Sequence, residues 1–136
     1  MSSDIKIIKS ERTGSQAHFI KHSSGLSIYV MEMPGFTGTS AMFGTRYGSV
    51  NTTFKTNADE DFITVPEGIA HFLEHKLFEN EDCDAIKLFA EMGANDNAYT
   101  SFDSTVYYFD CTDNFIESLE ILLDFVTHPC SLSTDF

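Results

Sequence analysis

Cysteine is scarce in this sequence, and the few present are not spaced for a shared purpose. The three are Cys83, Cys111 and Cys130, and no two stand at CxxC spacing. An odd number at such separations suggests neither a disulfide framework nor a thiolate zinc site. We expect each to be a small buried hydrophobe.

Long apolar runs are missing as well. No stretch approaches the roughly 18 apolar residues that a membrane-spanning helix needs. The polar residues 1–12 are not followed by the hydrophobic region of a signal peptide. We therefore expect no membrane partner and a cytoplasmic location, unless an export signal has been removed.

Basic residues are few, with 8 Lys and Arg against 21 Asp and Glu and a net charge of −13. This balance argues against a phosphate-binding surface, so we do not expect a nucleic-acid partner. The length of 136 residues and the hydrophobic share of 42% indicate one globular domain.

The pattern along the chain predicts an α+β fold, an antiparallel sheet covered by helices on one face. We expect three antiparallel strands first, then a long polar loop at 48–64 and a helix from Pro66 to Phe78. A second helix should end at Gly93. In a third, Asn114 and Glu117 resemble a capping box. The predicted strands are 16–22, 26–33, 39–47 and a β-rich stretch at 95–110, and the second and third helices are 84–92 and 113 or 114 to 127.

The informative pattern is His71-Phe-Leu-Glu74-His75. On a helix at about 100° per residue, His75 lies roughly 40° from His71, and Glu74 lies roughly 60° to the other side. Two imidazoles on adjacent turns suit zinc, and a nearby carboxylate suits proton removal from a zinc-bound water. Ile69, Phe72 and Leu73 fall on the opposite arc, with Ala70 and Leu77 beside them, and we expect these residues to face the core. The same spacing also occurs on solvated helix surfaces that bind nothing.

Residues 68–78 read GIAHFLEHKLF, and residues 93–100 read GANDNAYT and are followed by DSTVY at 103–107. Both segments resemble those of the pitrilysin/insulinase family of zinc metallopeptidases, the inverzincins. The resemblance covers about residues 20–130. It implies that His71 and His75 bind Zn²⁺ and that Glu74 activates the water.

The resemblance also implies a third ligand, a Glu, roughly 70–80 residues after His75 and so beyond Phe136. We therefore expect a truncated pitrilysin-like domain, residues 1–136, without its C-terminal ligand helix, which by itself binds zinc weakly and cleaves no peptide. Full-length or paired family members close around a peptide. The expected partners are thus a peptide substrate and a second pitrilysin-like domain or subunit.

Other residues of the matching segments are candidates for substrate binding. The stretch 95–100, with Asn97, Ala98 and Tyr99, resembles the family's edge strand, along which an extended peptide can pair. Phe78 and Tyr99 are predicted to wall one side-chain pocket. Asp103 is either a carboxylate that orients a zinc-bound His or an ordinary turn acid.

Three functions stay open. The first is a zinc endopeptidase domain that hydrolyses peptide bonds through a metal-activated water. The second is a non-catalytic pitrilysin-like subunit or fragment that binds peptides or an active partner chain. The third is an α+β domain whose His pair binds nothing. The intact motif favours the first, because a non-catalytic subunit has no need of Glu74.

Overall fold

The computed structural model describes residues 5–78 and 84–128. The chain forms two compact units, Met1–Phe36 and Thr37–Phe136. Cys83 and Cys130 lie outside the described residues, whereas Cys111 is buried as expected. None of the helices in the described part of the chain is long and apolar enough to cross a membrane.

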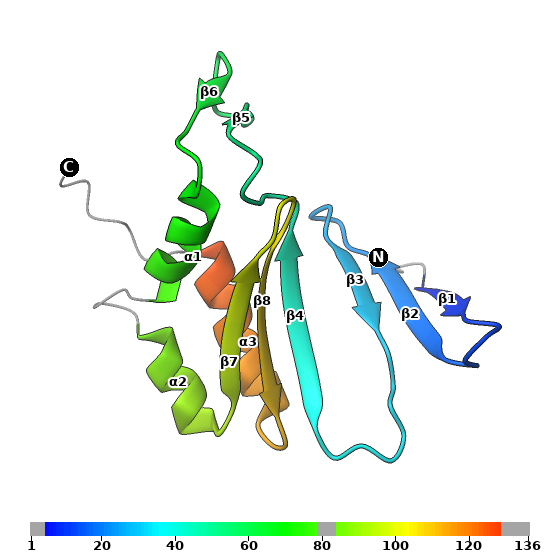
Figure 1. Ribbon diagram of the computed structural model, residues 1–136. Coiled ribbons are helices and arrows are strands. Elements are labelled where there is room, and N and C mark those ends of the chain that lie inside the picture. Colours follow the sequence, from blue (N-terminus) through cyan, green and yellow to red (C-terminus); the bar gives the residue numbers. More distant parts are fainter. Residues whose placement is uncertain (1–4, 79–83, 129–136) are drawn as a thin grey trace. The chain divides into compact units, whose positions relative to one another are not determined.

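The first unit is a three-stranded antiparallel sheet in the order β1-β2-β3 (Figure 1). The sequence predicted two of its strands, β2 (Gln16–Lys21) and β3 (Ser27–Val30), and the turn at Gly25. It missed β1 (Ile5–Lys9), which pairs with β2 through contacts such as Ile5 opposite Ile20. Its two lysines, Lys6 and Lys9, made the segment read as a polar end, and only the pairing partner identifies it as a strand.

The second unit is built on a three-stranded antiparallel sheet in the order β4-β8-β7. The third predicted strand, β4 (Thr39–Thr45), belongs to this sheet, where it pairs with β8 (Thr105–Cys111) along its whole length. The β-rich stretch at 95–110 is a hairpin: β7 (Asn95–Thr100) turns through residues 101–104 into β8. β7 therefore lies at an edge of the sheet.

The predicted polar loop at 48–64 contains a short hairpin of two strands, β5 (Thr53–Phe54) and β6 (Ile63–Thr64). Next to it, residues 48–50 lie along the β7–β8 turn. The amides of Ser49 and Val50 donate to the carbonyls of Ser101 and Phe102 at 2.9 and 3.0 Å. The loop thus braces the end of the hairpin.

Three helices, α1 (Ile69–Phe78), α2 (Ala85–Met92) and α3 (Phe115–Thr127), pack on the second sheet (Figure 1). In β8 alternate residues are buried, and Tyr107, Phe109 and Cys111 meet Phe89 of α2 and Leu122 of α3 in the core. Aromatic stacking continues this layer, with the Phe89 and Phe109 ring centroids 5.6 Å apart. The fold is α+β, as predicted, with the helices on one face of the sheet.

Helix boundaries correct the sequence predictions in two places. α1 begins at Ile69 rather than Pro66, because Gly68 has φ +84° and residues 66–68 form a turn. Asn114 does precede α3, but it is left-handed at φ 54° and forms no side-chain cap. Its side-chain amide instead donates to the backbone carbonyl of Met92 at 3.0 Å, which ties α3 to the end of α2. By contrast, Gly93 ends α2 in the left-handed conformation as predicted.

Candidate metal and catalytic site

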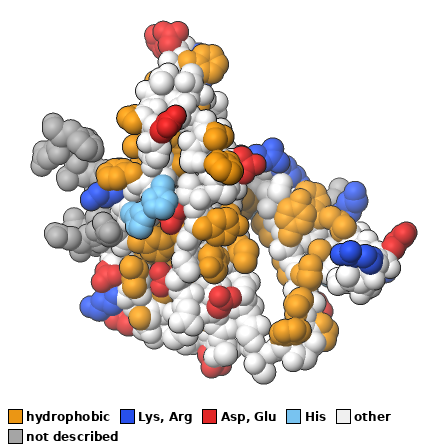
Figure 2. All heavy atoms as spheres, in the orientation of Figure 1, with side chains coloured by type: hydrophobic (Ala, Val, Ile, Leu, Met, Phe, Trp, Pro, Cys, Tyr) orange, Lys and Arg blue, Asp and Glu red, His pale blue; other side chains and the backbone are white. Residues whose placement is uncertain are grey.

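The two histidines of α1 lie side by side at the surface. Their Nε2 atoms are 2.8 Å apart and their ring centroids are 4.7 Å apart. In Figure 2 the histidine atoms form one pale-blue patch over α1. Because the two residues are about one helical turn apart, their ring nitrogens lie next to each other, as the sequence predicted.

The separation of the two nitrogens fits a shared metal ion. Two nitrogens that each lie about 2.0–2.1 Å from a tetrahedral zinc stand roughly 3.3 Å apart, so a few tenths of an ångström of opening suffices. Both histidines are exposed, so an ion can reach them. Among the described residues, no group of three or more His, Cys, Asp and Glu side chains is arranged to hold a metal. The third ligand that the family resemblance implies beyond residue 136 stays a prediction.

Glu74 lies on the adjacent arc of α1, on the side of the helix that faces the sheet. It is 8% exposed, the most buried charged residue of α1. One carboxylate oxygen accepts a hydrogen bond from the hydroxyl of Thr100 on β7. The tyrosine Tyr107 lies close enough for the Glu74 charge to act on it: burial and that charge together raise the pKa of Tyr107 to about 12.

The buried face of α1 matches the prediction from the helical wheel only in part. Ala70 and Glu74 are buried and Leu77 packs against the core, whereas Phe72 is 46% exposed beside Lys76. Relative to the predicted orientation, α1 is thus rotated about its own axis, so that Glu74 faces the interior and Phe72 faces solvent. The rotation is possible because Thr100 supplies a hydrogen-bond partner to a group that burial would otherwise penalise.

β7 presents a backbone edge close to α1, which it contacts. Ser101 and Ser104 form a backbone hydrogen bond of 2.8 Å, and such pairs alternate along an antiparallel ladder. The amide and carbonyl of Ala98 therefore point away from β8. The Ala98 amide is occupied by the side chain of its own neighbour, because it donates to the Asn97 carbonyl oxygen at 2.8 Å.

Phe78 and Tyr99 do not wall one pocket. Phe78 packs on Tyr107 and Phe125, with ring centroids 5.9 and 4.9 Å apart, on the helix-covered face of the sheet. Tyr99 lies on the other face, 50% exposed, with its ring 6.4 Å from Tyr108. Alternation along β7 separates them, since Ala98 and Tyr99 are adjacent residues and point to opposite faces.

Asp103 is a turn acid. Its carboxylate accepts hydrogen bonds from the hydroxyls of Ser101 and Ser104, both at 3.2 Å, within the turn that joins β7 to β8. The hydrogen bonds in the described part of the chain do not connect it to His71 or His75. The proposed role in orienting a ligand is therefore not supported, because the turn uses this side chain.

Sequence reasoning did not assign a role to Thr100 or Tyr107, although both belong to the second matching segment. The sequence contained part of the information needed to place these two residues near α1. Alternation along β7 places Thr100 on the same face as Ala98, and the strand pairing places Ala98 opposite Tyr107. The contact of Thr100 with Glu74 joins residues 26 positions apart and could not be read from local spacing.

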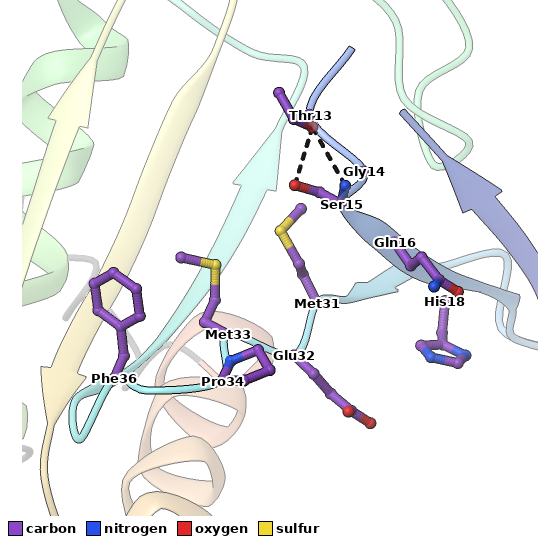
Figure 3. A pocket seen from close by; sticks show the side chains of 10 residues that line it. All are labelled: Thr13, Gly14, Ser15, Gln16, His18, Met31, Glu32, Met33, Pro34 and Phe36. Atoms are coloured by element: carbon purple, nitrogen blue, oxygen red, sulfur yellow. Dashed lines mark hydrogen bonds between the residues drawn. The ribbon is translucent and has the colours of Figure 1, made fainter. Parts of the chain in front are cut away.

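A hollow of about 470 Å³ also exists within the first unit, between the start of β2 and the segment after β3. Figure 3 shows Met31, Met33 and Phe36 on one side and Thr13 and Ser15 on another. Met31 and Phe36 are 52% and 71% exposed. The hollow is open and contains none of the motif residues.

Comparison with known proteins agrees with the geometry. The family model described as Insulinase (Peptidase family M16) matches residues 64–135. An uncharacterized zinc protease of Bacillus subtilis, YmfH, is 45% identical over 125 residues, which are 92% of this chain and 29% of the relative. The chain thus spans less than a third of that protein.

Solved structures show the same fold. An M16-like peptidase from Alicyclobacillus acidocaldarius superposes with a TM-score of 0.69 at 38% identity, over 93% of this chain and 26% of that one. Pitrilysin superposes with a TM-score of 0.69 at 19% identity, over 95% and 14%, which shows a shared fold. The matching family model covers the helix with both histidines and Glu74, and the chain belongs to the insulinase family of peptidases, peptidase family M16.

Proposed function

We propose that this chain carries the zinc-binding and proton-accepting elements of a metalloendopeptidase. The observation that carries the proposal is the geometry of α1: the Nε2 atoms of His71 and His75 converge to 2.8 Å, and Glu74 stands on the adjacent arc of the same helix. Membership of a peptidase family supports the reaction class.

His71 and His75 would hold the metal through their Nε2 atoms. Zinc in such a site supplies a Lewis acid that lowers the pKa of a bound water toward neutrality. Imidazole must be neutral to bind it, so metal binding competes with protons on both rings. Two protein ligands hold zinc weakly, and the family resemblance assigns the third to a residue beyond this chain.

Glu74 would accept the proton that the attacking water loses. Its carboxylate is nearly buried, and the Thr100 hydroxyl binds one of its oxygens. The other oxygen can take the proton. A positioned carboxylate that accepts a proton in the transition state contributes on the order of 10²–10⁴-fold to the rate.

The substrate would be an extended peptide that pairs with the edge of β7. The outward amide and carbonyl of Ala98 offer it a backbone partner, and the Asn97 side chain must leave the Ala98 amide when the peptide binds. Tyr99 would contact side chains on the outer face, whereas Phe78 packs on Tyr107 of the neighbouring strand β8 on the core side. A second domain of the same family would complete the enclosure of the peptide, as the resemblance implies.

The alternative is a non-catalytic subunit that binds peptides through the same edge. The two readings differ in what Glu74 does. A subunit that only binds would tolerate the loss of its carboxylate, whereas a peptidase would not.

The test uses the protein expressed from its complete reading frame, with a quenched fluorescent peptide as substrate. Glu74→Gln should retain zinc and lose at least about a hundredfold in turnover, because the amide cannot take a proton. His71→Ala should lose both zinc and turnover. His22→Ala, whose ring bonds to Ser24 in the first unit, is the control and should change neither. Turnover of Glu74→Gln near that of the unchanged protein would contradict the proposal.

A further inference from the structure

The Glu74 carboxylate has a single hydrogen-bond donor among the described residues, the hydroxyl of Thr100. An ionised carboxylate offers about four acceptor positions, and burial without partners is costly. A Glu side chain also has three rotatable bonds, so a lone carboxylate at the end of a helix side chain can adopt several orientations. The Thr100 hydroxyl selects one of them by binding one oxygen.

Thr100 is itself held firmly. It is the last residue of β7, opposite Thr105 on β8. Directly after it, the Ser101 amide donates to the Ser104 carbonyl at 2.8 Å, and the Ser101 carbonyl accepts from the Ser49 amide at 2.9 Å. Its branched β-carbon further restricts the direction of the hydroxyl. The donor is therefore fixed by the strand and by the loop that braces the turn.

The surroundings strengthen this bond. Glu74 is 8% exposed, and the nearby Tyr107 is 6% exposed. A hydrogen bond to a charged group gains strength where water is excluded. Little water therefore reaches the hydrogen bond between Thr100 and Glu74.

We propose that Thr100 is the positioning residue of the catalytic base: its hydroxyl holds one oxygen of Glu74 and turns the other toward the ligand pair His71 and His75. The inference rests on the proposed peptidase function. It adds a residue that acts through Glu74 rather than on the substrate. An ordinary structural threonine would stabilise the fold without favouring one orientation of the carboxylate.

The first experiment measures turnover in the protein expressed from its complete reading frame. Thr100→Val keeps the shape and removes the donor. It should lower kcat about ten- to a hundredfold, the loss of one hydrogen bond to a charged group, and leave KM and zinc content unchanged. Thr100→Ser restores the donor and should recover most of kcat. Thr53→Val is the matched control, because it removes an exposed threonine–threonine bond outside the site, and its kcat should not change.

The second experiment needs no activity. In the 136-residue chain, urea unfolding of Thr100→Val, Glu74→Met and the double variant forms a thermodynamic cycle. Thr100→Val should lower the equilibrium constant for folding about tenfold when Glu74 is present. In the Glu74→Met background the same substitution should lower it by less than about threefold. An equal effect in both backgrounds would show that the hydroxyl does not bind the carboxylate, and would overturn the inference.

The outcomes separate the two claims. If the unchanged protein shows zinc-dependent turnover and Thr100→Val is equally active, the positioning role alone is overturned. The same holds if Thr100→Ser does not recover kcat. A fall confined to KM does the same. A protein without zinc-dependent turnover overturns the proposed function, even where the cycle shows the bond between Thr100 and Glu74.

Discussion

Gly48 lies so close to Ser104 that it has no space for a side chain: a β-carbon at Gly48 would come within 2.5 Å of the Ser104 amide nitrogen and 2.6 Å of the Asp103 amide nitrogen. The neighbours are backbone atoms and cannot move aside independently. The brace on the β7–β8 turn, and with it the end of β7, therefore depends on this glycine.

Replacement of Gly48 by Ala should destabilise the protein by about 2–4 kcal/mol, since the loop must separate from the turn. Gly44→Ala is the control, because its β-carbon would meet Val106 at an ordinary 3.7 Å, and it should cost less than about 1 kcal/mol. Urea unfolding of the two variants measures the difference. Equal stability of both would show that the loop does not depend on this close approach.

Ser118 and Thr105 give opposite predictions for the removal of a buried hydroxyl. Ser118 is fully buried on α3, and its hydroxyl has no hydrogen-bond partner among the residues that the structure describes. Ser118→Ala should be neutral or stabilise by up to about 1 kcal/mol. The Thr105 hydroxyl, 3% exposed as a residue, donates to the Tyr47 carbonyl at 2.7 Å. Thr105→Val should therefore cost about 1–2 kcal/mol, because that carbonyl loses its donor. Thermal unfolding compares them, and a larger cost for Ser118→Ala would contradict the assignment of partners.

Tyr107 predicts a loss of stability at alkaline pH. Its pKa is about 12 in the folded protein because of burial and the Glu74 charge, against about 10 in an unfolded chain. Folding thus favours the protonated phenol. The stabilisation is complete below about pH 10 and is lost as the pH rises through about 12.

The measurement is urea unfolding at several pH values between 8 and about 12, on the unchanged protein and on Tyr107→Phe. The unchanged protein should lose about 2 kcal/mol more than the variant over this range. Tyr29→Phe, at a residue 64% exposed, is the control and should follow the unchanged protein. Parallel curves for all three would show that Tyr107 does not titrate as its surroundings predict.

Some features of this protein follow from neighbours in the sequence alone. The convergence of His71 and His75 needs only a helix, because residues four apart lie one above the other on adjacent turns. The stop at Gly93 is similarly local, since a glycine takes the left-handed conformation without a steric cost. These are short-range effects, and the pattern of residues was sufficient to predict them.

Other features depend on which surfaces meet in three dimensions. The rotation that buries Glu74 and exposes Phe72 follows from the position of β7, which brings Thr100 to the carboxylate. The pairing of β4 with β8, 60 or more residues later in the chain, is decided by the whole packed layer of helices and strands. Local patterns predicted that His71, Glu74 and His75 share a helix, but the direction in which the carboxylate points is a property of the tertiary structure. The free energy that fixes this direction comes from burial and from one long-range hydrogen bond. Neither contribution exists until the sheet and α1 are in contact.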